Sequence, residues 1–285
     1  MSAEISAVRC DGCGGSMAAV PGRPLPCCLF CGADPCALRQ FKPDGAILEP
    51  ETWLPFDVDE TAAQAAFHKF AKSSWWFPSD LAGSRVTLRR ILVPAWAWSG
   101  RLETTWAGLV SAATKSGKRP TTGAETKNFE QIVVPASAAL RPSELRDLGS
   151  WDEQKTRAFS RTTPEEPFEV STQTQAGLRE AAQEEMRTLH GESISQAHDL
   201  ISVRTSSVAH GLAGRPILLP VWIGAYRYGD VPYRVVVNGQ NGIFVGTAPW
   251  SKWKLFFAVA IPTVLLAAVL LGSFVCAGAS AVAAH

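Results

Sequence analysis

The sequence lacks a surplus of charge of either sign, because 27 Lys and Arg residues face 26 Asp and Glu residues in a chain of 285. A chain so close to neutrality has no large electrostatic field that would attract nucleic acid or acidic partners. The first 36 residues are slightly acidic, with two arginines against three carboxylates. DNA-binding segments are usually basic, since phosphate neutralisation supplies most of their affinity. The composition therefore disfavours nucleic-acid binding.

The common catalytic motifs are also missing. The sequence has no Gly-x-Ser-x-Gly elbow and no His-Glu-x-x-His pair. Ser116-Gly117-Lys118 resembles the end of a phosphate-binding loop, but that motif needs glycine where Ala112 stands and Ser or Thr where Arg119 stands. We therefore expect neither an enzyme nor a small-molecule substrate site.

The N-terminus lacks the apolar stretch of a secretory signal peptide. Six of the seven cysteines precede residue 255, and an odd total does not suit a complete disulfide framework. This cysteine usage predicts a reducing compartment for the N-terminal part of the chain.

Four of those cysteines form two Cys-x-x-Cys-Gly motifs, Cys10-Asp-Gly-Cys13-Gly14 and Cys28-Leu-Phe-Cys31-Gly32. Two such pairs can surround one tetrahedral metal ion. Each glycine permits a positive φ, which lets backbone N–H groups turn toward sulfur. The pattern predicts a zinc ribbon over residues 1–36, with a structural Zn²⁺ bound by Cys10, Cys13, Cys28 and Cys31.

Two further cysteines leave this ligand set open. Cys27 is adjacent to Cys28, and Cys36 follows the second motif, so either thiol could replace a ligand. Only Cys28 has the two-residue spacing to Cys31, which favours the set given above. The alternative is a group of free or disulfide-paired thiols, and the doubled spacing argues against it.

Residues 255–276 form a run of 22 without a charge. At about 1.5 Å per residue, a helix of this length spans roughly 33 Å, enough for a hydrocarbon core of about 30 Å. Trp250 and Trp253 precede the run, as interfacial aromatic residues do. We therefore expect a transmembrane anchor within residues 251–285 that contacts membrane lipid through residues 255–276.

The basic residues around this run predict its orientation. Lys252 and Lys254 stand before it, and only His285 could add positive charge after it. Positive residues favour the cytoplasmic side of a membrane. We expect a single-pass protein of the inner membrane with its N-terminal part in the cytoplasm.

Residues 37–250 are enough for one sizeable core or two small ones. Their pattern predicts an α+β domain with a mixed or antiparallel sheet and two main helices. Helical spacing of apolar residues indicates helices at 58–73 and 171–190, the second stopped by Gly191, and a helical turn at 143–148.

The strands are expected in short pieces separated by polar segments. Apolar β-rich runs predict strands at 91–96, 99–110, 131–136, 199–208, 216–228, 233–237 and 243–245. The polar segment 115–127 reads as a hairpin tip or loop, with a small basic cluster that is solvated or touches acidic lipid.

Three of these runs resemble one another. Ile91-Leu-Val-Pro-Ala-Trp96 is matched by Ile217-Leu-Leu-Pro-Val-Trp222, and Gln131-Ile-Val-Val-Pro-Ala136 is a fainter copy. In each copy the proline is expected to end or edge a strand. The copies are either equivalent strands of one sheet, a duplication, or convergent strand composition.

The aromatic cluster Trp75-Trp76-Phe77 closes the first expected helix. It is more often the cap of a core than a ligand site or a membrane-surface patch. We therefore expect these side chains to be packed against the domain.

The order of these features is similar to that of bacterial membrane-anchored zinc-ribbon proteins of the transcription-factor-IIB type, which are sometimes labelled primosomal helicases. The matching motifs after the cysteine pairs are Trp53–Phe56, Trp75–Pro78, Val93–Trp96, Leu219–Trp222, Tyr226–Tyr228 and Val237–Gly242. Some members of that group are implicated in recruiting phage-shock-type membrane-stress scaffolds to the inner membrane. This chain departs from them in its extra thiols and its single span, and it has no helicase motif.

Together these features predict a non-enzymatic, membrane-anchored adaptor that recruits a protein partner. A closed four-sulfur site leaves no open position for a substrate, so the zinc would be structural. Two alternatives from other classes are a regulator whose ribbon binds nucleic acid or the transcription machinery, and an enzyme acting on lipid or envelope precursors.

Overall fold

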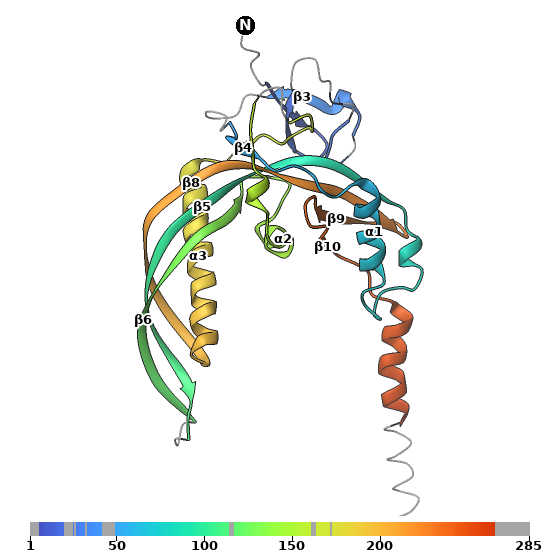
Figure 1. The fold of residues 1–285 in the computed structure, drawn as a ribbon. Helices are drawn as coiled ribbons and strands as arrows, with labels where there is room; N and C mark the ends of the chain where they lie inside the picture. The colour runs from blue at the N-terminus through green and yellow to red at the C-terminus, as the bar shows by residue number, and fades with distance from the viewer. Residues whose placement is uncertain are drawn as a thin grey trace, which may run out of the picture.

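Two long antiparallel strands, β5 (Val86–Ser111) and β8 (Leu200–Tyr228), run through the whole body of the molecule. The computed structural model describes residues 6–19, 25, 27–31, 33–41, 49–113, 117–160, 164–171 and 173–265 (Figure 1). Each long strand merges two runs that the sequence predicts as separate strands. The merged pair bends into an arch, along which the other elements are arranged (Figure 1).

The remaining strands extend this pair into a seven-stranded mixed sheet. β6 (Lys118–Pro135) pairs with the free side of β5, whereas β9 (Val231–Asn238) and then β10 (Phe244–Gly246) follow β8. The short β4 (Thr52–Trp53) lies parallel to β8, and β7 (Arg157–Ala158) pairs with β4. The expected α+β class and mixed sheet are confirmed.

The three similar sequence runs are neighbouring strands of this sheet. Leu92 pairs with Pro220 and Pro94 with Leu218, so the first two copies run antiparallel against each other. The third copy flanks them, with Ala95 paired to Pro135. The runs are therefore strands of one sheet, as the first of the three interpretations states.

Pro135 ends β6, as predicted, whereas Pro94 and Pro220 lie inside β5 and β8 and do not end them. The Pro94 carbonyl accepts from Ala136 N at 2.9 Å, and the Pro220 carbonyl accepts from Gly239 N at 2.8 Å. In a strand the N and C=O of one residue point to the same side, so both proline nitrogens face places where the neighbouring strand has just ended. No ladder donor is lost there, and the long strands continue.

Two of the helices cover the ends of the arch, and a short one lies under its middle (Figure 1). α1 (Glu60–Ala71) begins at the predicted carboxylates, where Asp59 Oδ1 accepts from Ala62 N at 2.7 Å. α2 (Pro142–Asp147) is the expected helical turn. α3 (Gln175–Ala197) packs along the other end of the sheet.

The sequence predicted that this helix would stop at Gly191, but α3 continues beyond that residue. Ile194 is fully buried against Trp106 and Leu200, and the helix continues to Ala197 to make this contact. Burying such a side chain contributes about 1.5–3 kcal/mol, which exceeds the cost of about 1 kcal/mol for a glycine inside a helix. The chain turns instead at Asp199, whose φ is 50°.

Segment 115–127 is not a polar loop. From Lys118 onward it belongs to β6, with Lys127 paired to Leu102 and Arg119 to Val110. From Thr121 its side chains alternate between half-buried and exposed, because successive residues of a strand point to opposite faces of the sheet. The predicted hairpin tip is restricted to the turn between β5 and β6, where Ala112 N donates to Gly117 O at 3.1 Å, and the prediction of a loop is wrong from Lys118 onward.

The cysteine-rich region forms a separate antiparallel sheet of β1 (Ser6–Cys10), β2 (Ser16–Ala19) and β3 (Leu38–Phe41), in the order β2-β1-β3. We call it the ribbon. It sits on the outer side of the arch at its middle (Figure 1). β3 lies beyond residue 36, where the predicted ribbon ended.

The segment 168–170 joins the ribbon to the arch. Ala18 N donates to Phe168 O at 3.0 Å and Val170 N to Ser16 O at 3.3 Å, while Glu169 N donates to Leu92 O at 2.9 Å. Buried ribbon residues, among them Met17, belong to the same apolar cluster as residues of β5 and β8. The ribbon is therefore attached by both hydrogen bonds and a shared core.

A buried carboxylate lies in this joint. Glu169 is 1% exposed, and its carboxylate accepts from the Ser137 hydroxyl and, at 2.7 Å, from Ala138 N. Burial raises the pKa of Glu169 to about 7, although these donors and Arg234 favour the charged form. Nothing in the sequence pattern singled out this residue.

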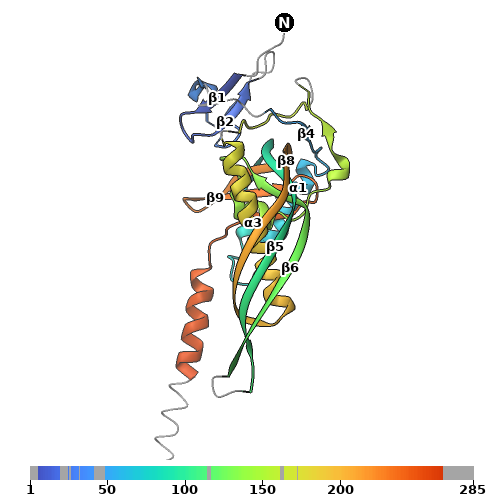
Figure 2. The same ribbon diagram turned by 90° about the vertical axis from the view of Figure 1, so that its left-hand side faces the viewer.

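Residues 252–265 form a helix that leaves the body at the end where α1 lies (Figure 1). Its apolar side chains, such as Phe256, Val259 and Leu265, are exposed. Figure 2 shows that this helix and the ribbon lie at opposite ends of the molecule. In the described part of the chain, helices of sufficient length and apolarity for a membrane span are absent. Residues 266–276 of the expected span lie outside the described residues, so the span stays a prediction.

The Glu169 joint makes stability depend on pH. Because the pKa is raised above its ordinary value of 4.5, the stabilisation is full below about pH 4.5 and is lost as the pH rises through about 7. Glu169→Gln removes the charge and keeps one acceptor oxygen, for Ala138 N, while its NH2 group replaces the oxygen that accepts from Ser137. We expect this variant to raise the free energy of unfolding at pH 8 by up to about 3 kcal/mol, less about 1 kcal/mol for the lost hydrogen bond. Urea unfolding of the full chain in detergent, at pH 5 and pH 8, measures this difference. The exposed Glu180→Gln is the control, and an unchanged pH dependence in Glu169→Gln would contradict the assignment.

Candidate metal centre

The first cysteine pair lies in the tight turn between β1 and β2. Cys10 is the last residue of β1, and its N–H donates to Gly15 O at 3.0 Å. Gly14 has a φ of 74° and donates to Cys10 O at 2.8 Å, which closes the turn. The predicted positive φ after the first motif is confirmed, whereas Gly32 of the second motif lies outside the described residues.

The second pair lies in a turn that packs beneath the first. Cys28 N donates to Ala33 O at 2.8 Å, and Leu29 N donates to the Met17 sulfur at 3.5 Å. The Phe30 ring lies against Gly15, where a Cβ atom would come within 2.1 Å of the ring. Gly15 and Phe30 therefore form a contact that fixes one turn on the other and excludes any side chain at position 15. The only sign of this contact in the sequence is the second glycine of Gly14-Gly15.

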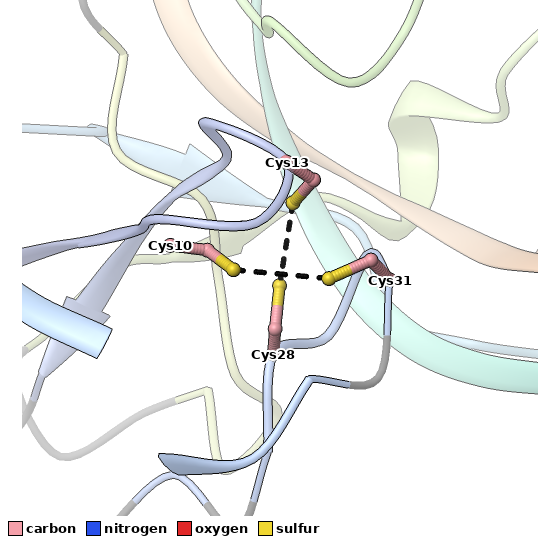
Figure 3. A group of neighbouring side chains, drawn as sticks. All are labelled: Cys10, Cys13, Cys28 and Cys31. Carbon is pink, nitrogen blue, oxygen red and sulfur yellow. Dashed lines mark hydrogen bonds between the residues drawn. The ribbon is translucent and has the colours of Figure 1, made fainter. Parts of the chain in front are cut away.

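The four Sγ atoms converge on one point (Figure 3). All lie within 4.8 Å of one another, with Cys10 and Cys31 sulfurs 3.7 Å apart and Cys13 and Cys28 sulfurs 3.6 Å apart. At a Zn–S bond of about 2.3 Å, two ligands of a tetrahedral site lie about 3.8 Å apart. The spacing of the sulfurs matches a four-coordinate metal ion.

Backbone N–H groups surround the sulfurs and affect their titration. Burial raises the pKa of the Cys10 thiol, but the N–H groups of Cys13 and Gly12 outweigh it and lower that pKa to about 7. Burial raises the pKa of Cys28 and of Cys13. Four neighbouring thiolates repel one another, and a bound divalent cation is what would keep all of them deprotonated.

The ligand set is buried on one side and open on the other. Cys10 and Cys28 are buried, whereas Cys13 and Cys31 are exposed. Cys27 is half-buried, Cys36 is exposed, and neither belongs to the group of converging sulfurs. Asp34 accepts from Cys36 N at 2.9 Å, which fixes Cys36 in a short 3₁₀ turn after the second pair.

This arrangement can bind a metal ion but offers it no vacant position. A tetrahedral set of four thiolates suits Zn²⁺ or iron, and it is closed to substrate. The two turns contain few other buried residues, so a bound ion would supply much of their folding energy.

The histidines of the described ranges form no second centre. His198 Nε2 lies 2.6 Å from Glu125, His190 Nδ1 lies 3.0 Å from the Thr104 hydroxyl, and each ring is thereby paired locally. Within the ranges given for Figure 1, no other group of His, Cys, Asp and Glu converges as the four cysteines do.

Comparisons with protein-family models, with curated proteins and with solved structures find no match for this chain. The similarity to membrane-anchored zinc-ribbon proteins therefore rests on the sequence motifs alone.

Metal content of variants tests the ligand set. We expect the purified full chain to carry one tightly bound ion and Cys10→Ser with Cys28→Ser to carry none, because loss of two ligands forfeits most of a binding free energy of about 10–16 kcal/mol. Inductively coupled plasma mass spectrometry gives both the stoichiometry and the identity of the metal. The matched control, Cys27→Ser with Cys36→Ser, keeps the ion; a control that loses it would show that the ligands are wrongly assigned.

Proposed function

We propose that this protein is a non-enzymatic adaptor anchored in the inner membrane, which recruits a protein partner from the cytoplasm. In this proposal Cys10, Cys13, Cys28 and Cys31 hold a structural Zn²⁺, and residues 255–276 span the bilayer. The partner binds the ribbon or the body beside it.

The observation that carries the proposal is the separation of the two ends. The ribbon stands on the outer side of the arch, and the apolar terminal helix leaves from the opposite end (Figures 1 and 2). A chain anchored through that helix would present its ribbon away from the lipid. An adaptor needs this geometry, because its partner must reach it without meeting the bilayer.

The attachment of the ribbon also supports this role. Its hydrogen bonds to Phe168 and Val170 and its share in the common core fix it on the arch. A fixed module can transmit the position of the membrane to a bound partner, whereas a freely tethered one would act only through effective concentration.

The closed metal set favours a binding role over chemistry at the ion. The four thiolates leave no coordination position for a substrate or for an activated water molecule. The ion would hold the turns in one shape, and that shape would be the recognised feature.

Fractionation and cross-linking of whole cells test the proposal. We expect the full chain and Cys10→Ser with Cys28→Ser to sediment with membranes, because the terminal helix is unchanged, and a chain lacking residues 251–285 to leave them. We also expect the cysteine variant to lose its cross-linked partner, since the folded ribbon is lost. Mass spectrometry of the cross-linked species measures this loss against Cys27→Ser with Cys36→Ser.

Undiminished recovery of the partner with the unfolded ribbon would exclude the ribbon as the recruiter. Salt-sensitive retention of DNA by the wild-type chain, absent from the cysteine variant, would instead favour the nucleic-acid alternative.

A further inference from the structure

Trp75 and Trp76 are not buried in the core, contrary to the sequence prediction. Trp75 is 64% exposed and Trp76 is 39% exposed, and only Phe77 of this cluster packs on the body, through Phe70 at 5.4 Å between ring centroids. Two adjacent indoles exposed to water form an apolar patch, and such patches mark interaction sites. The segment that contacts these two indoles indicates what kind of partner the patch would bind.

That segment is the start of the terminal helix. Trp76 stacks on Trp250 with ring centroids 6.1 Å apart, and the Trp76 carbonyl accepts from Ser251 N at 2.8 Å. Lys254 Nζ donates to the Phe77 carbonyl at 2.8 Å and lies 5.4 Å from the centre of the Trp75 ring. The loop after α1 is therefore held against the first turn of the helix by side-chain and backbone contacts.

Trp75, Trp76 and Trp250 are linked by ring contacts, and Trp253 follows in the first turn of the helix. We call these four exposed tryptophans the aromatic collar. Trp250 is 63% exposed and Trp253 is 72% exposed. The apolar, uncharged part of the helix begins at Leu255, directly after the collar. Tryptophan rings accompanied by lysine are the residues that proteins place at the level of lipid headgroups.

We propose that the aromatic collar inserts into the interfacial region of the lipid bilayer, so that the loop Ser73–Pro78 is a second membrane contact beside the helix. The proposal rests on the membrane attachment proposed above. Lys69 and Lys72, exposed at the end of α1, add positive charge beside the collar that favours anionic headgroups.

This contact would fix the orientation of the arch. A helix alone lets the attached domain swing about the residues that join them. A collar built from both the loop and the helix has two separate points in the interface, and the bonds from Trp76 and Phe77 to the helix keep these points together. The orientation of the ribbon relative to the membrane is then fixed as well.

Fluorine NMR of the full chain labelled with fluorotryptophan tests this proposal. The protein is placed in nanodiscs of phosphatidylcholine and phosphatidylglycerol, and each resonance is assigned by a single Trp→Phe replacement. One probe is a lipid with a nitroxide near the head of its acyl chain, and the other is a water-soluble gadolinium chelate. Buried Trp98 and Trp222 serve as controls that neither probe should affect.

We expect the nitroxide lipid to abolish the Trp75, Trp76, Trp250 and Trp253 resonances while the chelate leaves them intact. If the nitroxide lipid affects Trp253 but the chelate abolishes Trp75 and Trp76, the helix is in the bilayer and the collar proposal fails. If Trp75 and Trp76 are protected from both probes, protein covers them and the lipid assignment fails. Loss of the Trp253 resonance to the chelate alone would overturn the membrane attachment itself.

Discussion

The antiparallel pairing of β5 with β8 is the constraint on which the other parts of the structure depend. It brings residues far apart in the sequence into register, from Val86 with Tyr226, 140 positions apart, to Val110 with Leu200, 90 positions apart. α1 and α3 pack near its two ends, and the ribbon joint lies between them at Leu92. Such non-local pairing is slow to form, because the chain closes a long loop before the contacts stabilise it. Each functional element therefore takes its place from the sheet rather than from its own sequence.

What the sequence predicted correctly was local. The two cysteine pairs and the Asp59 cap of α1 act through neighbours a few positions away, so spacing alone identifies them. The errors came from long-range packing. Pro94 reads as the end of a strand, but its missing N–H matters only if a partner strand continues opposite it, and β6 ends there. Gly191 reads as a helix stop, but Ile194 extends the helix to reach Trp106. The sequence could not identify Glu169 as a group with a raised pKa, because that shift depends on its burial in the folded protein.

The ribbon and the arch differ in what stabilises them. The arch has a large buried core that extends through β5, β8 and α3, whereas the ribbon has few buried side chains of its own. A domain of that size normally needs a metal ion or disulfides in addition to its core. The turns that carry Cys10 and Cys28 touch the arch through Met17, whose sulfur accepts from Leu29 and whose strand pairs with the segment at Glu169. A bound metal ion would therefore stabilise the two turns directly and the joint with the arch only through them.

This order of dependence would let one chain combine the proposed anchor with the proposed recognition module. Loss of the ion would unfold the turns, but the arch would keep its pairing, because none of the contacts between β5 and β8 involves the ribbon. The aromatic collar lies at the far end of the arch, where α1 packs on Trp222 and Tyr226. Its contacts are independent of the ribbon for the same reason. Two sites coupled only through a rigid sheet can keep a fixed separation without affecting each other's stability. A fixed separation between lipid and partner is what a membrane adaptor requires.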